Sequence, residues 1–527
     1  MHNSNIRILY LVLVTIMIMS IGIGSVHAQG PPNAPGAQAG PGPGVPGGMP
    51  GGQNMTGMQG PPGDMTGAPE GFALSTETPE EIEAVINAVI YVDGNKITVQ
   101  RDKVAPVSSL NTIERRINRG TITAIESQES GIYVKNGGSF TIENSTISKP
   151  TGPFTYGMPE SGEMGPNTLR AVISYGLNSV VLSTGKGSKI SLNNVKVNAI
   201  GLNSPEDVFA ANPVYATFDG VICLNNVEIN ADGSAGHGVD CTSGGTFYID
   251  TAEITTRGST GSALATDNPG GNIYAMKITA TVWGDRSAGI YCDGGSIMDI
   301  SESVIESKLM EGMVICNDGS VTLNNVKLTG RLDAVKVHFR RGTGNAKSFI
   351  SDSTLVSKEG GGIVFDGGWG DITIDNTKIK AADGKYLVRS QEGSSDKGTG
   401  EGILRVRNSK LAGNIGADEA SILKVFLEGT TLKGAIEFAG ISLGADSKWD
   451  ITADSRVIEL KITNRAGISA SKAVTVTFGS SGTIKNGDKI GNVTFFKDSS
   501  LAYPEVANMG MEATLMGGGM PGGTSTP

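Results

Sequence analysis

Residues 289–305, GIYCDGGSIMDISESVI, are the stretch that decides the fold. A short apolar segment at residues 290–292 ends in an Asp-Gly-Gly turn, and a second at residues 297–300 ends in polar residues 301–303 before the apolar pair 304–305. Apolar and polar residues alternate along the stretch, which is typical of strands that bury one face. Three short strands joined at Gly or polar corners predict one coil of a parallel β-helix.

The same pattern recurs through the middle of the chain. Residues 190–197, ISLNNVKV, and residues 321–328, VTLNNVKL, repeat it closely. The last apolar residue of each unit falls at Ile147, Val197, Ile229, Ile254, Ile278, Ile305, Leu328, Leu355, Ile379, Leu411 and Leu432. The spacing of these positions drifts within a narrow range, except that the first interval is much longer and predicts two coils with an insertion. Nothing in the pattern indicates repeated helices.

Asparagine marks one corner of the repeat. Three residues before the last apolar residue stand Asn144, Asn194, Asn226, Asn325, Asn376 and Asn408, with Asp352 and Thr251 as variants. Asn tolerates left-handed backbone geometry, and its amide can hydrogen-bond the amide one coil away. We therefore expect a structural ladder of stacked asparagines.

With this ladder, the chain resembles the right-handed parallel β-helices of the pectin-lyase-like superfamily, and more narrowly the secreted, Gly-rich, adhesin-like surface proteins. The resemblance covers about residues 85–495 and implies an all-β, right-handed parallel β-helix, a solenoid. That fold hosts lyases, hydrolases, adhesins and inert stalks, so the resemblance implies no single activity.

The flanking segments have a different composition. Residues 1–28 predict a signal peptide because Arg7 precedes an uncharged apolar run at residues 8–23 and Val26 and Ala28 fit a cleavage site; an uncleaved anchor is the alternative. Residues 29–75 predict a disordered Gly/Pro/Met-rich linker, and residues 498–527 a disordered Gly/Met-rich tail. Between them we expect an N-terminal cap and first coil at 76–120, with a capping helix over 78–89, and the β-helix at 121–497.

Charge and cysteine content exclude some classes. The net charge of −10 provides no cationic field for nucleic acid, and four Cys in 527 residues make no disulfide scaffold. Cys241, Cys292 and Cys316 stand at nearly the same position within their units, counted back from the last apolar residue. We expect them to form a column of buried free thiols, with Cys292 and Cys316 on adjacent coils. A disulfide between those two is the alternative, although parallel stacking gives it poor geometry.

Catalytic motifs are sparse. A polygalacturonase-like hydrolase needs paired carboxylates, yet the chain has no Asp-Asp, and no Arg-x-Lys follows Gly236-His237-Gly238 on the next coils. We therefore interpret His237 as a surface or corner histidine. The sequence also indicates no aromatic platform for sugar binding.

Two further groups of residues are site candidates. Asp residues precede the Gly turns at Asp219, Asp240, Asp267, Asp293, Asp318 and Asp366. Stacked carboxylates repel, which a hard cation would relieve, so Asp240, Asp267, Asp293 and Asp318 are candidate Ca²⁺ ligands, with ordinary turn chemistry as the alternative. Arg340 and Arg341 beside His338 form a compact basic cluster that could meet a sugar acid.

Together these features predict a secreted or cell-envelope β-helix protein without catalytic activity. Its expected partner is a surface polysaccharide or a cell-envelope component, with no nucleic acid, no transmembrane domain after signal cleavage and no cofactor other than Ca²⁺. A polysaccharide lyase or glycoside hydrolase with a divergent site is the alternative, and a purely structural role stays open.

Overall fold

The computed structural model describes residue 82 and residues 85–126, 128–150, 174–200, 212–267, 270–338, 344–394 and 398–504. The predicted signal peptide, the linker and most of the predicted tail lie outside these ranges. Apart from three short 3₁₀ turns, the named elements within them are strands. The helix predicted over 78–89 is wrong at its end, because Val89 lies in strand β1 (Asn87–Asp93). In the described ranges, no helix is long and apolar enough to cross a membrane.

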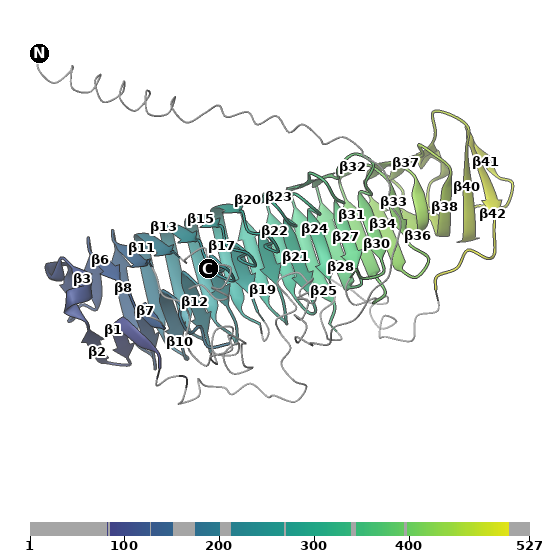
Figure 1. Ribbon diagram of the computed structural model, residues 1–527. Helices are drawn as coiled ribbons and strands as arrows, with labels where there is room; N and C mark the ends of the chain where they lie inside the picture. The colour runs from purple at the N-terminus through teal and green to yellow at the C-terminus, as the bar shows by residue number, and fades with distance from the viewer. Residues whose placement is uncertain are drawn as a thin grey trace, which may run out of the picture. The chain divides into compact units, whose positions relative to one another are not determined.

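Most strands pair in parallel with the strand one coil away, so that each coil contributes to three faces (Figure 1). The first face contains β7 (Glu129–Lys135), β10 (Val181–Thr184), β12 (Val214–Thr217), β14 (Val239–Cys241), β16 (Leu264–Thr266), β18 (Ile290–Cys292), β21 (Met313–Cys316), β24 (Val335–His338), β27 (Ile363–Asp366), β30 (Val388–Gln391) and β33 (Ile415–Ala417). The second face contains β8 (Ser139–Glu143), β11 (Lys189–Ala199), β13 (Val221–Ala231), β15 (Thr246–Thr256), β17 (Asn272–Val282), β19 (Ile297–Ser301), β22 (Ser320–Asn324), β25 (Ala346–Ser351), β28 (Trp369–Asp375), β31 (Glu401–Arg407), β34 (Ile422–Glu428), β36 (Ile436–Leu443), β38 (Ser455–Ile462), β40 (Val474–Ser481) and β42 (Val493–Lys497). The third face contains β6 (Thr121–Thr123), β9 (Thr146–Lys149), the second halves of β11, β13, β15 and β17, and then β20 (Val304–Ser307), β23 (Lys327–Gly330), β26 (Thr354–Ser357), β29 (Lys378–Lys380), β32 (Lys410–Ala412), β35 (Thr431–Lys433), β37 (Lys448–Asp450) and β39 (Ile468–Ser469). The described chain is thus all-β and mostly parallel, consistent with a β-solenoid.

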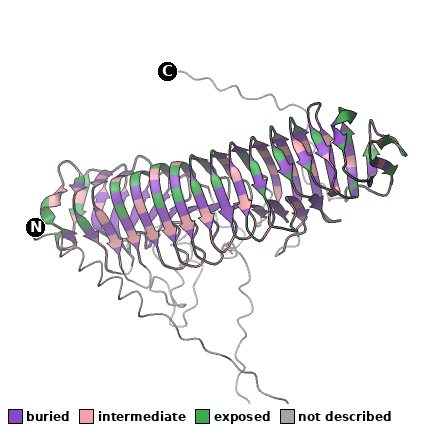
Figure 2. Cartoon of the chain, turned by 90° about the horizontal axis from the view of Figure 1, so that it is seen from above, coloured by how far each residue is buried: buried purple, intermediate pink, exposed green. Residues whose placement is uncertain are grey.

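Buried residues alternate with less buried ones along most strands of the second and third faces, and Figure 2 shows the resulting bands of colour. Most strands of the first face, such as β10, β12 and β21, are buried along their whole length. The inward column on the third face pairs Ile147 with Val197. Because these two residues are direct partners, the long interval between them is one coil and not the two predicted. Farther along, Ile254 pairs with Ala280 and not with Ile278. Both Ile278 and Ala280 are buried, and the period-2 pattern alone cannot distinguish positions two residues apart.

The corner between the second and third faces has left-handed backbone geometry. Its asparagines are Asn144, Asn194, Asn226, Asn325, Asn376 and Asn408, with φ between 43° and 55°, and Thr251, Lys277 and Glu302 have similar values. Asn194 Nδ2 donates to Asn144 Oδ1 at 2.7 Å, and Asn226 Nδ2 donates to Asn194 Oδ1 at 3.1 Å. Asn408 departs from this arrangement and donates to Asp375 Oδ1. The αL corner therefore recurs from coil to coil, while the amide chain is local.

Antiparallel pairs lie near both ends of the parallel stack. At the N-terminal end, β1 pairs with β2 (Lys96–Val99), β3 (Val104–Ala105) with β6, and β4 (Leu110–Asn111) with β5 (Arg116–Asn118). At the C-terminal end, β41 (Lys489–Ile490) pairs with β42. These pairings occupy strand edges that would otherwise be open to another chain.

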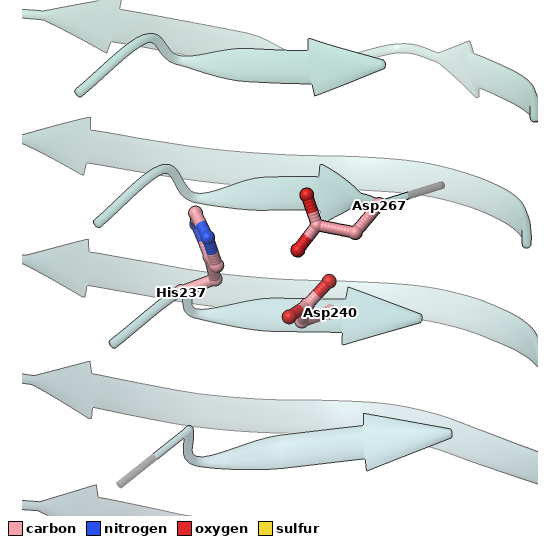
Figure 3. Close-up of side chains that lie close together, drawn as sticks. All are labelled: His237, Asp240 and Asp267. Atoms are coloured by element: carbon pink, nitrogen blue, oxygen red, sulfur yellow. The ribbon is translucent and has the colours of Figure 1, made fainter. Parts of the chain in front are cut away.

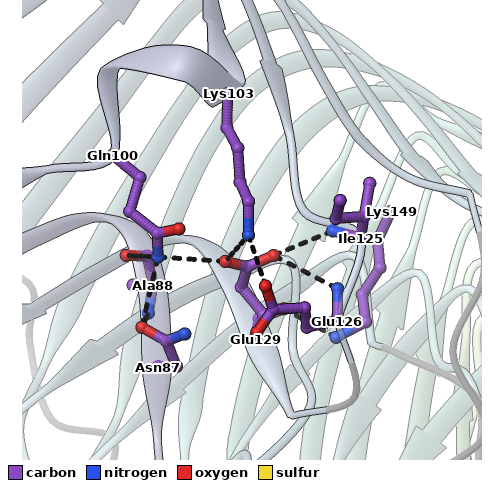
Figure 4. Close-up of polar contacts among 8 residues, drawn as sticks. All are labelled: Asn87, Ala88, Gln100, Lys103, Ile125, Glu126, Glu129 and Lys149. Carbon is purple, nitrogen blue, oxygen red and sulfur yellow. Dashed lines mark hydrogen bonds and ion pairs between the residues drawn. The ribbon is translucent and has the colours of Figure 1, made fainter.

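A buried ion cluster joins the N-terminal pairs to the first face (Figure 4). Glu129, fully buried in β7, accepts hydrogen bonds at Oε1 from Gln100 Nε2 (3.0 Å) and Lys103 Nζ (2.6 Å). Its Oε2 accepts from the backbone N–H groups of Ile125 and Glu126. Lys149 Nζ donates to the backbone carbonyl of Glu129 at 2.6 Å. Both carboxylate oxygens of Glu129 therefore have donors.

Candidate functional site

Three polar side chains converge on the first face between two consecutive coils. His237 lies in the corner before β14, Asp240 lies within β14, and Asp267 follows β16 directly. Figure 3 shows the three side chains directed toward one another, and one ligand atom from each lies within 4.8 Å of the others. All three residues are buried, with exposed fractions of 9%, 1% and 8%. This is the one group of three or more His, Cys, Asp or Glu residues in the described ranges with metal-ligand spacing.

The Gly-His-Gly segment is held by backbone contacts. A Cβ at Gly238 would lie 2.4 Å from Ile254 Cγ2 and 2.7 Å from the Ala263 carbonyl oxygen, so this position requires glycine. The His237 N–H donates to Asn212 Oδ1 at 2.9 Å, and the Ser262 N–H donates to His237 Nδ1 at 3.0 Å. His237 occupies a corner, one of the two positions predicted for it, but the alternative of a surface histidine is wrong because the residue is buried.

The Ser262 contact fixes the tautomer of His237. Because Nδ1 accepts a hydrogen bond, the neutral ring carries its proton on Nε2. Burial lowers the pKa of His237 to about 4, which keeps the ring neutral near pH 7. His237 is therefore a hydrogen-bond donor at Nε2.

The two carboxylates oppose each other's ionisation. Burial raises the pKa of Asp240 well above its usual range, and the neighbouring Asp267 raises it further. Two full charges within 4.8 Å repel by about 3 kcal/mol or more at an effective dielectric constant of about 20. Asp240 Oδ1 is buried without a hydrogen-bond partner among the described residues.

The predicted column of Asp residues is not one column. Asp240 pairs in register with Ala265, whereas Asp267 and Asp293 follow the paired residues Thr266 and Cys292. Asp293 accepts hydrogen bonds from Tyr291 Oη (3.1 Å) and Asn317 Nδ2 (2.5 Å). Asp318 lies in the turn after β21 and accepts from the Asn345 N–H at 2.9 Å. Of the four Ca²⁺ candidates, the structure brings Asp240 and Asp267 together with His237.

A second charged cluster lies on the first face at β24. Lys336 Nζ is 3.0 Å from Asp366 Oδ2 and 3.5 Å from Glu311 Oε1, and both acids are nearly fully buried. Burial opposes the charge of Lys336, but these two carboxylates outweigh it and raise its pKa. Burial raises the pKa of the nearby Asp333 to about 6. His338 Nδ1 lies 3.8 Å from Asp366 Oδ2, and the predicted Arg340 and Arg341 lie outside the described residues.

An aromatic pair lies on the outer surface of the second face. Tyr248 in β15 and Tyr274 in β17 are direct register partners, and their rings stack at a centroid distance of 5.4 Å and an interplanar angle of 13°. They are 51% and 38% exposed. Asp299 is the next residue in the same column, and Asn272 lies two residues before Tyr274. The sequence did not indicate this exposed aromatic pair.

The cysteines are free thiols as predicted, and Cys241 and Cys292 share an inward column through Thr266, but Cys316 does not belong to it. Cys241, Cys292 and Cys316 are buried, and Cys223 is half-buried. Cys292 pairs with Ile315, so Cys316 falls one residue out of the column. A shift of one residue moves a side chain to the opposite face of a strand, and Cys316 accordingly packs in a separate cluster with Tyr291 and Val314.

None of the family models, curated proteins or solved structures compared with the chain matches it. The comparisons therefore identify no family.

Sequence reasoning missed the residues whose roles depend on register. Tyr248 and Tyr274 lie one repeat length apart, and both stand three residues before a left-handed corner residue. That shared position is a usable signal in the sequence. Glu311, Asp333 and Lys336 have no such signal, because each stands at a different position within its coil.

Proposed function

We propose that this protein is a secreted or cell-envelope right-handed parallel β-helix that binds a neutral glycan without catalysing its breakdown. The observation that carries the proposal is the stacked, half-exposed pair Tyr248 and Tyr274 on an otherwise regular β-surface. Aromatic rings offer sugars a large apolar surface at low entropic cost. The apolar segment at residues 8–23 supports export across a membrane.

The charges around the tyrosines favour a neutral ligand. Asp299 is exposed beside Tyr274, and Asp250, also exposed, lies two residues after Tyr248. Lys277 Nζ is 3.7 Å from Asp250 Oδ1, so this cation is already matched by an acid. A polyuronic acid would place further carboxylates beside Asp299, which costs binding free energy. Hydroxyl groups, in contrast, can pair with the carboxylates and with the Asn272 amide.

Affinity electrophoresis of the full chain against neutral polysaccharides and polygalacturonate tests this function. We expect retardation by a neutral polymer, and a loss of affinity of about tenfold or more, equal to about 1.4 kcal/mol, in Tyr248→Ala/Tyr274→Ala. Phe349→Ala is the matched control: Phe349 is 42% exposed in the same column, between Thr322 and Thr373. Equal losses in both variants, or retardation by no glycan, would contradict the tyrosine site.

Polysaccharide cleavage is the second candidate function, and the half-buried Asp333, whose carboxyl interacts with Lys336, favours it. A group such as Asp333, with a pKa of about 6, suits a general acid. The pairing of Lys336 with two carboxylates disfavours a lyase, which needs a neutral base. Asp366 also holds Gln391 Nε2 and Ser394 Oγ, each at 2.9 Å. Release of reducing ends without an unsaturated product, by the wild type but not by Asp333→Asn, would establish a hydrolase.

A further inference from the structure

The buried carboxylate of Asp240 lies beside a second buried carboxylate, that of Asp267. Their carboxylates come from consecutive coils and meet within 4.8 Å, together with His237. The one basic group among these three, His237, is neutral in its observed hydrogen-bonding state, because Nδ1 accepts from Ser262. The amide of Asn212 reaches Asp240 Oδ2 only at 3.5 Å, the limit of a hydrogen bond.

A second observation points to a ligand. Asp240 is 1% exposed, and its Oδ1 has no hydrogen-bond partner in the described part of the chain. Buried polar atoms are nearly always paired with protein, with water or with an ion. Figure 3 shows the Asp240 carboxylate directed into the space that it shares with Asp267 and His237.

We propose that Asp240 and Asp267 bind a hard divalent cation, of the Ca²⁺ or Mg²⁺ class, between two coils of the first face. His237 is a positioning residue, whose Nε2–H orients a ligating carboxylate. Carboxylate oxygens with completing waters are the ligands such ions prefer. Ligating carboxylates are commonly held by a further hydrogen bond of this kind.

The tautomer of His237 argues against a zinc-type site. A metal on Nε2 requires the ring proton to move to Nδ1, where it would meet the Ser262 N–H instead of accepting from it. Without the imidazole, only oxygen ligands remain, and these do not favour a borderline-soft ion. The set of donors therefore selects for hard cations.

The ion has a structural role in this proposal. Asp240 and Asp267 are too deeply buried for a polymeric substrate to reach both. A cation shared by residues from β14 and from the end of β16 would tie these two coils together. This site lies on the first face and is independent of the tyrosines proposed for glycan binding on the second.

The experiment measures the melting temperature and metal content of the full chain, stripped with chelator and then supplied with Ca²⁺, Mg²⁺ or Zn²⁺. We expect Ca²⁺ or Mg²⁺ to raise the melting temperature progressively with concentration, with one ion bound per chain by mass spectrometry. Asp240→Asn and Asp267→Asn should abolish both effects. Asp293→Asn should retain them, because Asp293 is a buried Asp on the next coil whose oxygens already have partners.

His237→Gln separates positioning from coordination. Gln keeps an N–H donor but offers no imidazole, so the ion should still bind, with affinity weakened about tenfold. Stabilisation by Zn²⁺ alone that is lost in His237→Gln would overturn the oxygen-only site. The absence of bound metal and of any stabilisation by the three ions would overturn the proposal as a whole. Asp240→Asn should fold without metal because it also removes a buried charge. Its folding therefore shows that loss of the metal effects in this variant is not caused by unfolding.

Discussion

Glu129 and Asp240 are carboxylates buried on the same face of the strand stack, yet their surroundings are opposite. Glu129 receives hydrogen bonds at both oxygens, from two side chains and two backbone N–H groups. Asp240 has an oxygen with no partner among the described residues and a second carboxylate within 4.8 Å. The two residues are equally inaccessible, so burial alone does not distinguish them.

The pKa values follow this difference. Burial opposes ionisation of Glu129, but the hydrogen bonds from Lys103, Ile125 and Glu126 outweigh it, and the pKa is lowered. For Asp240, burial and the charge of Asp267 act in the same direction, and the pKa is raised. A buried acid whose donors are complete stabilises the fold, whereas one whose donors are incomplete indicates a site for a ligand.

The largest effect is expected at Glu129. Glu129→Gln removes the charge that holds Lys103 and places an amide N–H₂ against existing donors, so it should lower the free energy of unfolding by about 3–5 kcal/mol. Urea unfolding followed by circular dichroism measures the change. Glu126→Gln is the control: Glu126 contacts the same Lys103 but is 61% exposed, so its loss should cost less than about 1 kcal/mol. Similar costs at both positions would remove the basis of the comparison.

The pH dependence of stability tests Lys149, which belongs to the same buried cluster as Glu129. Burial lowers its pKa to about 7, although the Glu129 charge acts in the opposite direction. Between pH 7 and the ordinary Lys value of about 10.4, the unfolded chain binds more protons than the folded chain, so stability rises with pH in this window. The slope should approach about 1.4 kcal/mol per pH unit at its steepest.

Urea midpoints of Lys149→Met at pH 7, 8 and 9 measure this contribution. The variant should lose the rise in stability, while Lys196→Met, at a lysine that is 45% exposed, should keep it. An unchanged pH dependence in Lys149→Met would assign the rise to another group.

At Asp240, replacing the carboxylate by an amide should increase the stability of the fold, whereas the same change at Glu129 decreases it. In metal-free buffer, Asp240→Asn removes the repulsion with Asp267 and should raise the free energy of unfolding by about 1–3 kcal/mol. Asp293→Asn should lower the free energy of unfolding. An Asn Nδ2 would replace one of the two Asp293 oxygens that accept hydrogen bonds from Asn317 and Tyr291. Thermal unfolding of both variants after chelation gives the comparison. Destabilisation by Asp240→Asn would show that its charge is already compensated.

The sequence was sufficient for the architecture because the relevant information is local. Alternation in residues 289–305 predicts strands, and Asn at corners such as Asn194 predicts left-handed backbone geometry. Neither prediction requires knowledge of the neighbouring coil. The parallel all-β stack was predicted on that basis. The alternation does not determine the lengths of individual coils, and the pairing of Ile147 with Val197 shows that an insertion can imitate an additional coil.

The candidate sites depend on register, which the sequence specifies weakly. Cys316 is one residue out of its predicted column, and that single step moves it from the interior to the other side of β21. Lys336 contacts Glu311 and Asp366, which lie on the coils before and after it. Predicting these contacts likewise requires the exact number of residues in two coils. The burial of His237 is not predictable from the sequence for a different reason, since burial of a corner depends on what packs over it.

The smallest effect is expected at Asn194, which has complete partners like Glu129 but lies at the surface. Its amide donates to Asn144 and accepts from Asn226, and its φ is 55°. Asn194→Gly keeps the left-handed backbone and loses only the ladder bonds, so it should cost about 0.5–1 kcal/mol in urea unfolding. Asn194→Ala should cost about 1 kcal/mol more, because Ala is strained at this φ. Equal costs for Gly and Ala would mean that the amide bonds, and not the backbone, hold this corner; satisfied partners would then matter as much at the surface as they do around Glu129.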